Sequence, residues 1–262
     1  MTGSGQRQAE LWGPSAKLWA ERHEAPGLPL SEWLLDRVYA GNGAHILDAG
    51  CGSGGALVIA ASRGANVTGT DVAIEMLEIC KQRIPSGSFH VADTEALPFA
   101  DETFDGVIAQ NSLQFTETPV RALKELARVA KPNAKIGIVC FGAMEHSDFA
   151  TVGAKVRKLF VTPPTFEGPF SLSPPSKLHQ AIADADLKLL ESEDITLIQE
   201  HESFETFWQG QSGTGATRFS VRELGEELVK NTMATALKQF TNADGRIILS
   251  NQFHAVMVGK NG

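Results

Sequence analysis

The sequence has few cysteines and no recognisable metal-binding pattern. Its three cysteines, Cys51, Cys80 and Cys140, are scattered, odd in number and without a CxxC spacing. We therefore expect them to be reduced, small apolar side chains rather than a set of disulfides. The spacing of His, Cys, Asp and Glu side chains that is typical of zinc or calcium sites is missing as well, so no metal is expected.

The chain also lacks a basic run and a long apolar run. It carries 23 Lys and Arg against 31 Asp and Glu, a net charge of −8, which argues against nucleic acid as a partner. No stretch is long and apolar enough to span a membrane. The N-terminus is polar and Gly-rich, without the apolar core of a signal peptide. We expect a cytoplasmic protein that acts on a small molecule, either as a monomer or as a homodimer.

Between residues 45 and 141 short apolar runs alternate with helical patterns. This alternation predicts an α/β fold, a doubly wound and mostly parallel sheet with helices on both faces. Later apolar runs, at 187–190 or 195–199 and within 246–258, predict an antiparallel hairpin at one edge of the sheet. The expected parallel strands are the run at 46–47 and residues 66–70, 88–92, 104–109 and 135–141; the expected helices begin near 54 and cover 74–84 and 119–130.

Helical patterns outside this region predict a lid and a cap. Residues 1–10 are expected to be a tail, followed by a helix from Leu11 to about Glu24 and a second helix over 31–39 with Ser31 as its N-cap. All segments are expected to form one compact domain. The expected parts are an N-terminal helical lid (1–40), a cofactor-binding core (41–142), a cap segment (143–186), and the remaining core strands with an inserted helical cap (187–262).

A glycine turn directly follows the first expected strand. Asp48 ends that strand, and glycines then alternate at Gly50, Gly52 and Gly54. Glycine tolerates positive φ and lets a ligand approach bare backbone, while the helix behind the turn presents free N–H groups. In open α/β sheets, ligands bind outside the carboxyl ends of the strands. The turn therefore predicts a ligand site.

Polar residues end the next three expected strands as well. Asp71 lies about twenty residues beyond the glycines, the usual distance for an acid that accepts both hydroxyls of a ribose. Asp93 is placed to accept from an exocyclic amine such as that of adenine, and Gln110 ends the fourth strand. Together these positions predict a nucleoside-binding site.

Two nucleoside cofactors fit the glycine pattern. Gly50, Gly52 and Gly55 satisfy the GxGxxG fingerprint of dinucleotide enzymes, so an NAD-linked oxidoreductase is one alternative. A charge on Asp48 beside the turn would repel a pyrophosphate and attract an ammonium or sulfonium group. Asp93 is also no part of the dinucleotide fingerprint. These two acids favour a cationic cofactor.

The motifs resemble those of class I S-adenosylmethionine-dependent methyltransferases. Residues 45–54 are similar to motif I in its Leu-Asp-x-Gly-Cys-Gly form, and residues 70–77 resemble the ribose-binding segment. Residues 92–99 and 104–108 are similar to the next two motifs. The likeness covers about residues 40–142 and is greatest to the small-molecule branch that includes ubiquinone/menaquinone-biosynthesis-like enzymes. It implies a seven-stranded sheet whose last strand is antiparallel.

The resemblance further implies S-adenosylmethionine as the cofactor and assigns contacts to it. Trp19, on the expected lid, either belongs to the core or covers the ligand. The implied contacts are Gly50 and Gly52 at the methionine part, Asp48 at its ammonium or nearby polar groups, Asp71 at the ribose, Val72 and Met76 along the adenine, Asp93 and the Thr94 backbone at the adenine amine, and Gln110 near the reactive methyl.

The implied reaction is in-line methyl transfer to a small, apolar or aromatic acceptor, with the acceptor pocket formed by segments outside the motifs. If a base is needed, His146, just beyond the fifth strand, and His23, in the lid, are the candidates on intrinsic pKa. A second alternative stays open. The chain could bind S-adenosylmethionine on a methyltransferase-like fold and catalyse another reaction, or serve as a partner subunit.

Overall fold

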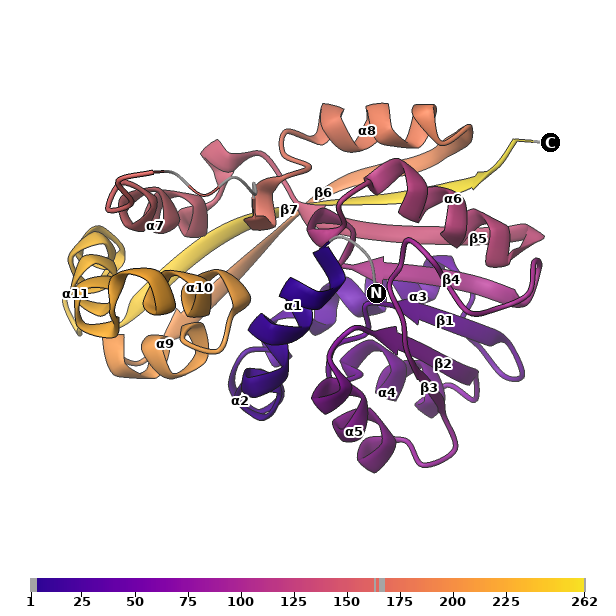
Figure 1. The fold of residues 1–262 in the computed structure, drawn as a ribbon, viewed down its shortest axis with the longest axis horizontal. Coiled ribbons are helices and arrows are strands. Elements are labelled where there is room, and N and C mark those ends of the chain that lie inside the picture. Colours follow the sequence, from indigo (N-terminus) through magenta and orange to yellow (C-terminus); the bar gives the residue numbers. More distant parts are fainter. Residues whose placement is uncertain (1–3, 163, 165–167, 262) are drawn as a thin grey trace.

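The computed structural model describes residues 4–162, 164 and 168–261. At its centre lies a seven-stranded sheet with the order β3-β2-β1-β4-β5-β7-β6 (Figure 1). The strands β1 to β5 are parallel, and β7 runs antiparallel between β5 and β6. The expected fold is thereby confirmed. The strands are β1 (His45–Ala49), β2 (Asn66–Asp71), β3 (Ser88–Val91), β4 (Phe104–Gln110), β5 (Ala130–Phe141), β6 (Leu187–His201) and β7 (Ile247–Lys260).

Each face of the sheet has its own buried cluster. Ile46 and Ile108 pack with one set of helices, whereas their neighbours Leu47 and Val107 pack with the other set. Because both faces are covered, the central strands appear in the sequence as continuous apolar runs. The first face carries α3 (Leu28–Arg37), α4 (Gly55–Ser62) and α5 (Ile74–Arg83), and the second carries α6 (Pro119–Val129) and α8 (Pro175–Asp184).

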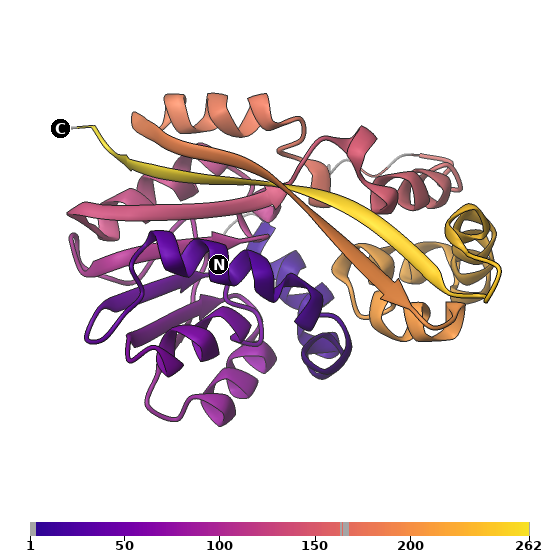
Figure 2. The ribbon, with the colours of Figure 1, turned by 180° about the vertical axis from the view of Figure 1, so that it is seen from behind.

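The hairpin of β6 and β7 extends well beyond the sheet. Its strands pair along their whole length, but β5 pairs only with residues 253–258 of β7. The outer half therefore runs into a helical cap at the far end of the molecule (Figures 1 and 2). The cap helices are α7 (Asp148–Arg157), α9 (Phe204–Gln211), α10 (Gly215–Leu224) and α11 (Glu226–Leu237).

The two late strands are longer than expected, and their packing explains why. In β7, Ile247 and Leu249 are buried in the cap cluster, while Ile248 between them is 40% exposed. A strand with one covered face shows only every second residue as apolar. Each of these long strands therefore appears in the sequence only as short, separate apolar runs. Helix α8, within the expected cap segment 143–186, packs on the sheet beside α6.

The N-terminal expectations need two corrections. Residues 4–10 belong to a helix, α1 (Ser4–Trp12), and not to a tail; Ser4 and Gly5 are buried. Helix α2 (Ala16–Arg22) follows after a short 3-10 turn. Ser31 is no N-cap, because α3 already begins at Leu28 with a proline in its first turn. The Ser31 hydroxyl instead donates to the amide oxygen of Gln110 at 2.7 Å.

Candidate cofactor and acceptor site

A cavity of about 680 Å³ opens at the carboxyl ends of the parallel strands and continues under the cap. It is bounded by the sheet, by α1 and α2, and by helices of the cap. Every residue implied as a cofactor contact lines this cavity. These residues are Trp19, Asp48, Gly50, Gly52, Asp71, Val72, Met76, Asp93, Thr94 and Gln110.

The glycine turn requires glycine at its first position. Gly50, Gly52 and Gly54 all have positive φ, at 78°, 53° and 86°. A Cβ on Gly50 would lie 2.3 Å from Cβ of Ser112, whose hydroxyl donates to the carbonyl of Ala49 at 2.6 Å. The turn is therefore packed tightly against the end of β4, and its backbone forms one wall of the cavity.

Asp71 joins the end of β2 to the glycine turn. One carboxylate oxygen accepts from the backbone N–H of Gly52 and the other from that of Ala73, both at 2.9 Å. Burial raises the pKa of Asp71, and these backbone donors oppose the shift. A carboxylate has about four lone-pair positions, so two hydroxyls of a ribose can still bind beside the backbone donors.

Asp48 is buried and incompletely hydrogen-bonded. Its side chain is close to inaccessible, and Oδ1 has no partner within the described residues. Burial, followed by the charges of Asp71 and Glu24, raises the pKa of Asp48 to about 8. This corrects the simple expectation of a permanent negative charge at neutral pH. Asp48 is mostly protonated in the free protein, and a bound cation would favour its ionised form.

Asp93 lies beneath the helix that the sequence did not predict. Its Oδ1 accepts from the N–H of Glu95 at 3.0 Å, while Oδ2 is buried and has no hydrogen-bond partner among the residues that the structure describes. A Cβ on Gly5 of α1 would lie 2.8 Å from that oxygen. The unpaired oxygens of Asp48 and Asp93 suit a ligand that carries N–H donors at both ends, as S-adenosylmethionine does with its ammonium and its adenine amine.

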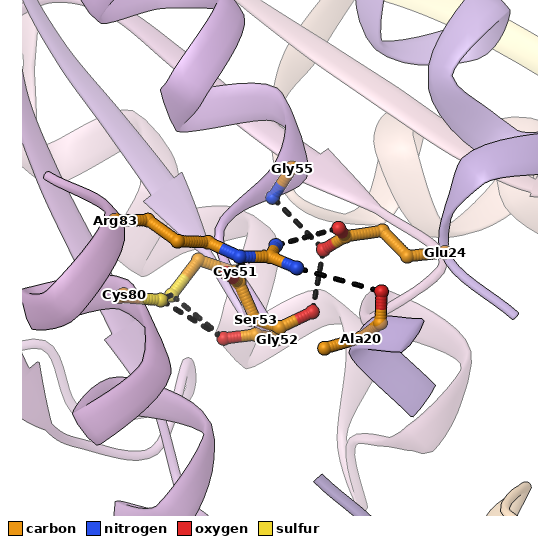
Figure 3. A network of polar contacts seen from close by, with 8 residues as sticks. All are labelled: Ala20, Glu24, Cys51, Gly52, Ser53, Gly55, Cys80 and Arg83. Carbon is orange, nitrogen blue, oxygen red and sulfur yellow. Dashed lines mark hydrogen bonds and ion pairs between the residues drawn. The ribbon is translucent and has the colours of Figure 1, made fainter. Parts of the chain in front are cut away.

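A lid carboxylate occupies the N-terminus of α4, the position where a dinucleotide would place its pyrophosphate. Glu24 accepts from the backbone N–H of Gly55 at 3.0 Å and from the hydroxyl of Ser53 (Figure 3). Helix N-termini bind anions, and this one already has the chain's own anion. Glu24 therefore gives a stronger argument against NAD than Asp48 does. The sequence contained no signal for it.

Gln110 connects the end of β4 to the N-terminal helices. Its amide oxygen accepts from Ser31, and its amide nitrogen donates to the carbonyl of Gly27 at 3.0 Å. Both ends of the side chain are thus engaged within the protein. Gln110 lines the cavity, but its amide fixes the start of α3.

The structure separates the two candidate bases. His23 lines the cavity, with its ring centroid 4.7 Å from that of Trp19. Burial, with a smaller effect of His201, lowers the pKa of His23 to about 4. The imidazole is therefore neutral at physiological pH and only weakly basic. His146 is exposed on a 3-10 turn (Met144–His146) and is not among the residues that line the cavity.

The part of the cavity beneath the cap is mainly aromatic. The expected segments supply Phe149, Phe170 and Phe207, whereas Phe141 and Phe253 come from strands β5 and β7. The strand residues were missed because an aromatic residue that faces a cavity from a strand has the same sequence pattern as one in the core. The acids that line the cavity, Glu24, Asp48, Asp71 and Asp93, all lie on the lid or at the carboxyl ends of β1 to β3.

Within the part of the chain that the structure describes, no group of three or more His, Cys, Asp and Glu side chains is placed to hold a metal ion. The cysteines are free and buried, with Cys51 Sγ 3.9 Å from Cys80 Sγ. Among the described helices, none combines the length and apolar character needed to cross a bilayer.

Residues 47–138 match the family model described as "Methyltransferase domain". The demethylmenaquinone methyltransferase of Renibacterium salmoninarum is 35% identical over 119 residues, which are 45% of this chain and 50% of that protein. The O-methyltransferase resE of Aspergillus sclerotiorum is 31% identical over 166 residues, 61% of this chain and 60% of that protein. The chain thus matches between half and two thirds of the length of these relatives.

Solved structures with a similar fold cover nearly the whole chain. A putative methyltransferase from Bacillus halodurans C-125 has a TM-score of 0.61 at 17% identity, covering 88% of this chain and 99% of that one. The [4+2]-cyclase SpnF has a TM-score of 0.58 at 20% identity, covering 89% and 81%. Residues 47–138 belong to the methyltransferase domain family, and the chain has the class I methyltransferase fold. The family resemblance drawn from the motifs is confirmed.

Proposed function

We propose that this protein transfers the methyl group of S-adenosylmethionine to a small, largely apolar or aromatic acceptor. The observation that carries the proposal is the continuous cavity of about 680 Å³. One end has the glycine turn and the carboxylates of β1 to β3, and the other end is lined by aromatic side chains of the sheet and the cap. A cationic nucleoside suits the first end, and an apolar molecule suits the second.

Four groups of this chain would hold the cofactor. Asp71 would accept the ribose hydroxyls, and Asp93 the adenine amine, while Val72 and Met76 would lie along the adenine. Asp48 would face the ammonium in its ionised form. One oxygen each of Asp48 and Asp93 has no partner in the described part of the chain, which supports this assignment, since buried acceptors without a partner are uncommon in folded proteins.

When bound, S-adenosylmethionine supplies an electrophilic methyl group on a sulfonium sulfur. The residues of this chain contribute orientation and the exclusion of water. The lid residues Trp19 and His23 and residues of the cap line the cavity, and we expect them to limit the access of bulk water to a bound cofactor. His23, with a pKa of about 4, is too weak a base to ionise an alcohol. The site therefore suits acceptors that ionise readily or react without losing a proton first.

The test is methyl transfer itself. The protein is incubated with S-adenosylmethionine and a panel of phenols, carboxylic acids and hydroxylated apolar compounds, and S-adenosylhomocysteine and methylated products are measured by mass spectrometry. We expect stoichiometric formation of both with at least one apolar acceptor. Binding of S-adenosylmethionine without methyl transfer to any acceptor class would favour another reaction on the same fold. Binding of NAD in place of S-adenosylmethionine would overturn the proposal.

A further inference from the structure

One charged side chain of the lid contacts the glycine turn directly. The lid segment, residues 16–27, consists of α2, the linking residues His23 and Glu24, and the 3-10 turn Ala25–Gly27. Glu24, just before that turn, binds Ser53 and Gly55 through one oxygen and the guanidinium of Arg83 through the other, at 2.6 Å (Figure 3). The side chain of Glu24 is only 16% exposed, so this ion pair is partly shielded from water.

Arg83 also forms hydrogen bonds with the backbone of both the glycine turn and the lid segment. It projects from α5 and also donates to the carbonyl of Ser53 in the glycine turn, at 2.9 Å, and to the carbonyl of Ala20 in α2, at 3.4 Å. One guanidinium thus connects α5, the glycine turn and the lid segment. Charge-assisted, partly buried hydrogen bonds of this kind are stronger than those of an exposed ion pair.

The lid segment places aromatic side chains over the cavity. Nε1 of Trp19 lies 3.6 Å from the position that a Cβ on Gly52 would take, and His23 packs beside Trp19. On its other side the segment rests on the cap, because a Cβ on Gly210 would lie 3.2 Å from the carbonyl oxygen of Arg22. The lid segment therefore lies between the glycine turn and the cap, and it lines the cavity that both share.

We propose that Glu24 and Arg83 form a latch that holds the lid segment closed over the cofactor and so controls how fast the cofactor leaves. Glu24 is a positioning residue, since it acts by fixing Trp19 and His23 above the glycine turn and by capping α4. The proposal rests on the proposed function for the identity of the cofactor. The existence of the latch does not depend on it.

The test measures release of S-adenosylhomocysteine by surface plasmon resonance. Glu24→Gln keeps the shape and an acceptor oxygen but removes the charge, and we expect release to become about tenfold faster. Arg83→Gln should have a similar effect. The double variant should release more slowly than the product of the two single effects predicts, because the ion pair that both changes break can be lost only once. Arg83→Lys, which keeps the cation, should release more slowly than Arg83→Gln.

Glu21→Gln is the matched control. Glu21 lies on α2 in the same lid segment, but it pairs with Lys17 at 3.8 Å on the surface, where the side chains of Glu21 and Lys17 are 54% and 86% exposed. Its release rate should equal that of the wild type. A wild-type rate for Glu24→Gln, or strictly additive effects of the Glu24 and Arg83 changes, would overturn the latch.

Hydrogen exchange of the ligand-free proteins separates the latch from the proposed function. Amides of the lid segment should exchange faster in Glu24→Gln than in the wild type, while those of the cap helix α11 should not change. Unaltered exchange of the lid segment would also overturn the latch. If the wild type does not bind S-adenosylhomocysteine but the lid exchanges faster in Glu24→Gln, the proposed function fails and the latch stands.

Discussion

Acids from separate parts of the chain converge near the glycine turn. Asp48 lies near the end of β1, Asp71 ends β2 and Glu24 belongs to the lid. Burial, followed by the charges of Asp71 and Glu24, raises the pKa of Asp48. A protein without a ligand in this region holds carboxyl groups that are costly to ionise. A bound cation relieves that cost, so ligand binding and proton release should be coupled.

Cofactor binding should release a proton from Asp48. At pH 7, below its pKa of about 8, Asp48 is mostly protonated in the free protein, and the ammonium of S-adenosylhomocysteine should ionise it. Calorimetric titrations in buffers of different ionisation enthalpy measure this release. We expect close to one proton per ligand at pH 7 for the wild type and none from this position in Asp48→Asn. Equal proton release in both proteins would contradict the assignment.

Asp48 should also make the ligand-free protein less stable as the pH rises. Its pKa is raised from 3.8 to about 8, so the folded state binds more protons than the unfolded state between these values. The stability that this proton binding gives is complete below about pH 4 and is lost as the pH approaches 8. Asp48→Asn should therefore gain Tm relative to the wild type at pH 8 more than at pH 5. If the difference in Tm between Asp48→Asn and the wild type were the same at both pH values, Asp48 would not be buried and protonated in the ligand-free protein.

At the scale of elements, α1 shows what the sequence did not reveal. Its start, Ser4-Gly5, has the composition of a flexible terminus, and helix propensity alone gives no reason to expect order there. The helix is held by tertiary contact, since Gly5 lies against Asp93 and Val72 and Leu11 is buried. The latch could not be predicted from the sequence for the same reason. Glu24 and Arg83 are 59 residues apart in the chain, and only the tertiary structure brings them together.

Gly5→Ala should disturb the cover over the adenine end. An added Cβ would lie 2.8 Å from Oδ2 of Asp93, so α1 or the carboxylate must shift. We expect faster hydrogen exchange in α1 and weaker binding of S-adenosylhomocysteine by several-fold. Gly41→Ala is the control, because a Cβ at this glycine, which does not line the cavity, would come no closer than 3.8 Å to the carbonyl oxygen of Tyr39. It should leave both measurements unchanged. Normal binding and exchange in Gly5→Ala would show that α1 does not cover the site.

At the scale of the whole molecule, the parallel part of the sheet and the cofactor end of the cavity could be predicted from local sequence patterns. The strand and helix alternation, the glycine turn and the acids at successive strand ends all follow from short-range rules, and the structure contains each of them. The residues that line the acceptor end of the cavity could not be predicted. They depend on how far β6 and β7 reach beyond the sheet and on which faces of α7 and α9 turn inward, and long-range packing decides both.

The cofactor end supports the central claim, which is that the cavity binds S-adenosylmethionine through Asp71. Asp71→Ala removes the proposed acceptor of both ribose hydroxyls, together with the hydrogen bonds from Gly52 and Ala73. Asp244→Ala changes an exposed acid in the turn before β7 and serves as the control.

The most direct measurement is a calorimetric titration of wild type, Asp71→Ala and Asp244→Ala with S-adenosylhomocysteine and, separately, with NAD. We expect one molecule of S-adenosylhomocysteine to bind to the wild type and to Asp244→Ala with equal affinity, and no heat from NAD. In Asp71→Ala the affinity should fall by about a hundredfold, the loss of roughly two hydrogen bonds to a charged group. Unchanged affinity in Asp71→Ala, or binding of NAD alone by the wild type, would contradict the account.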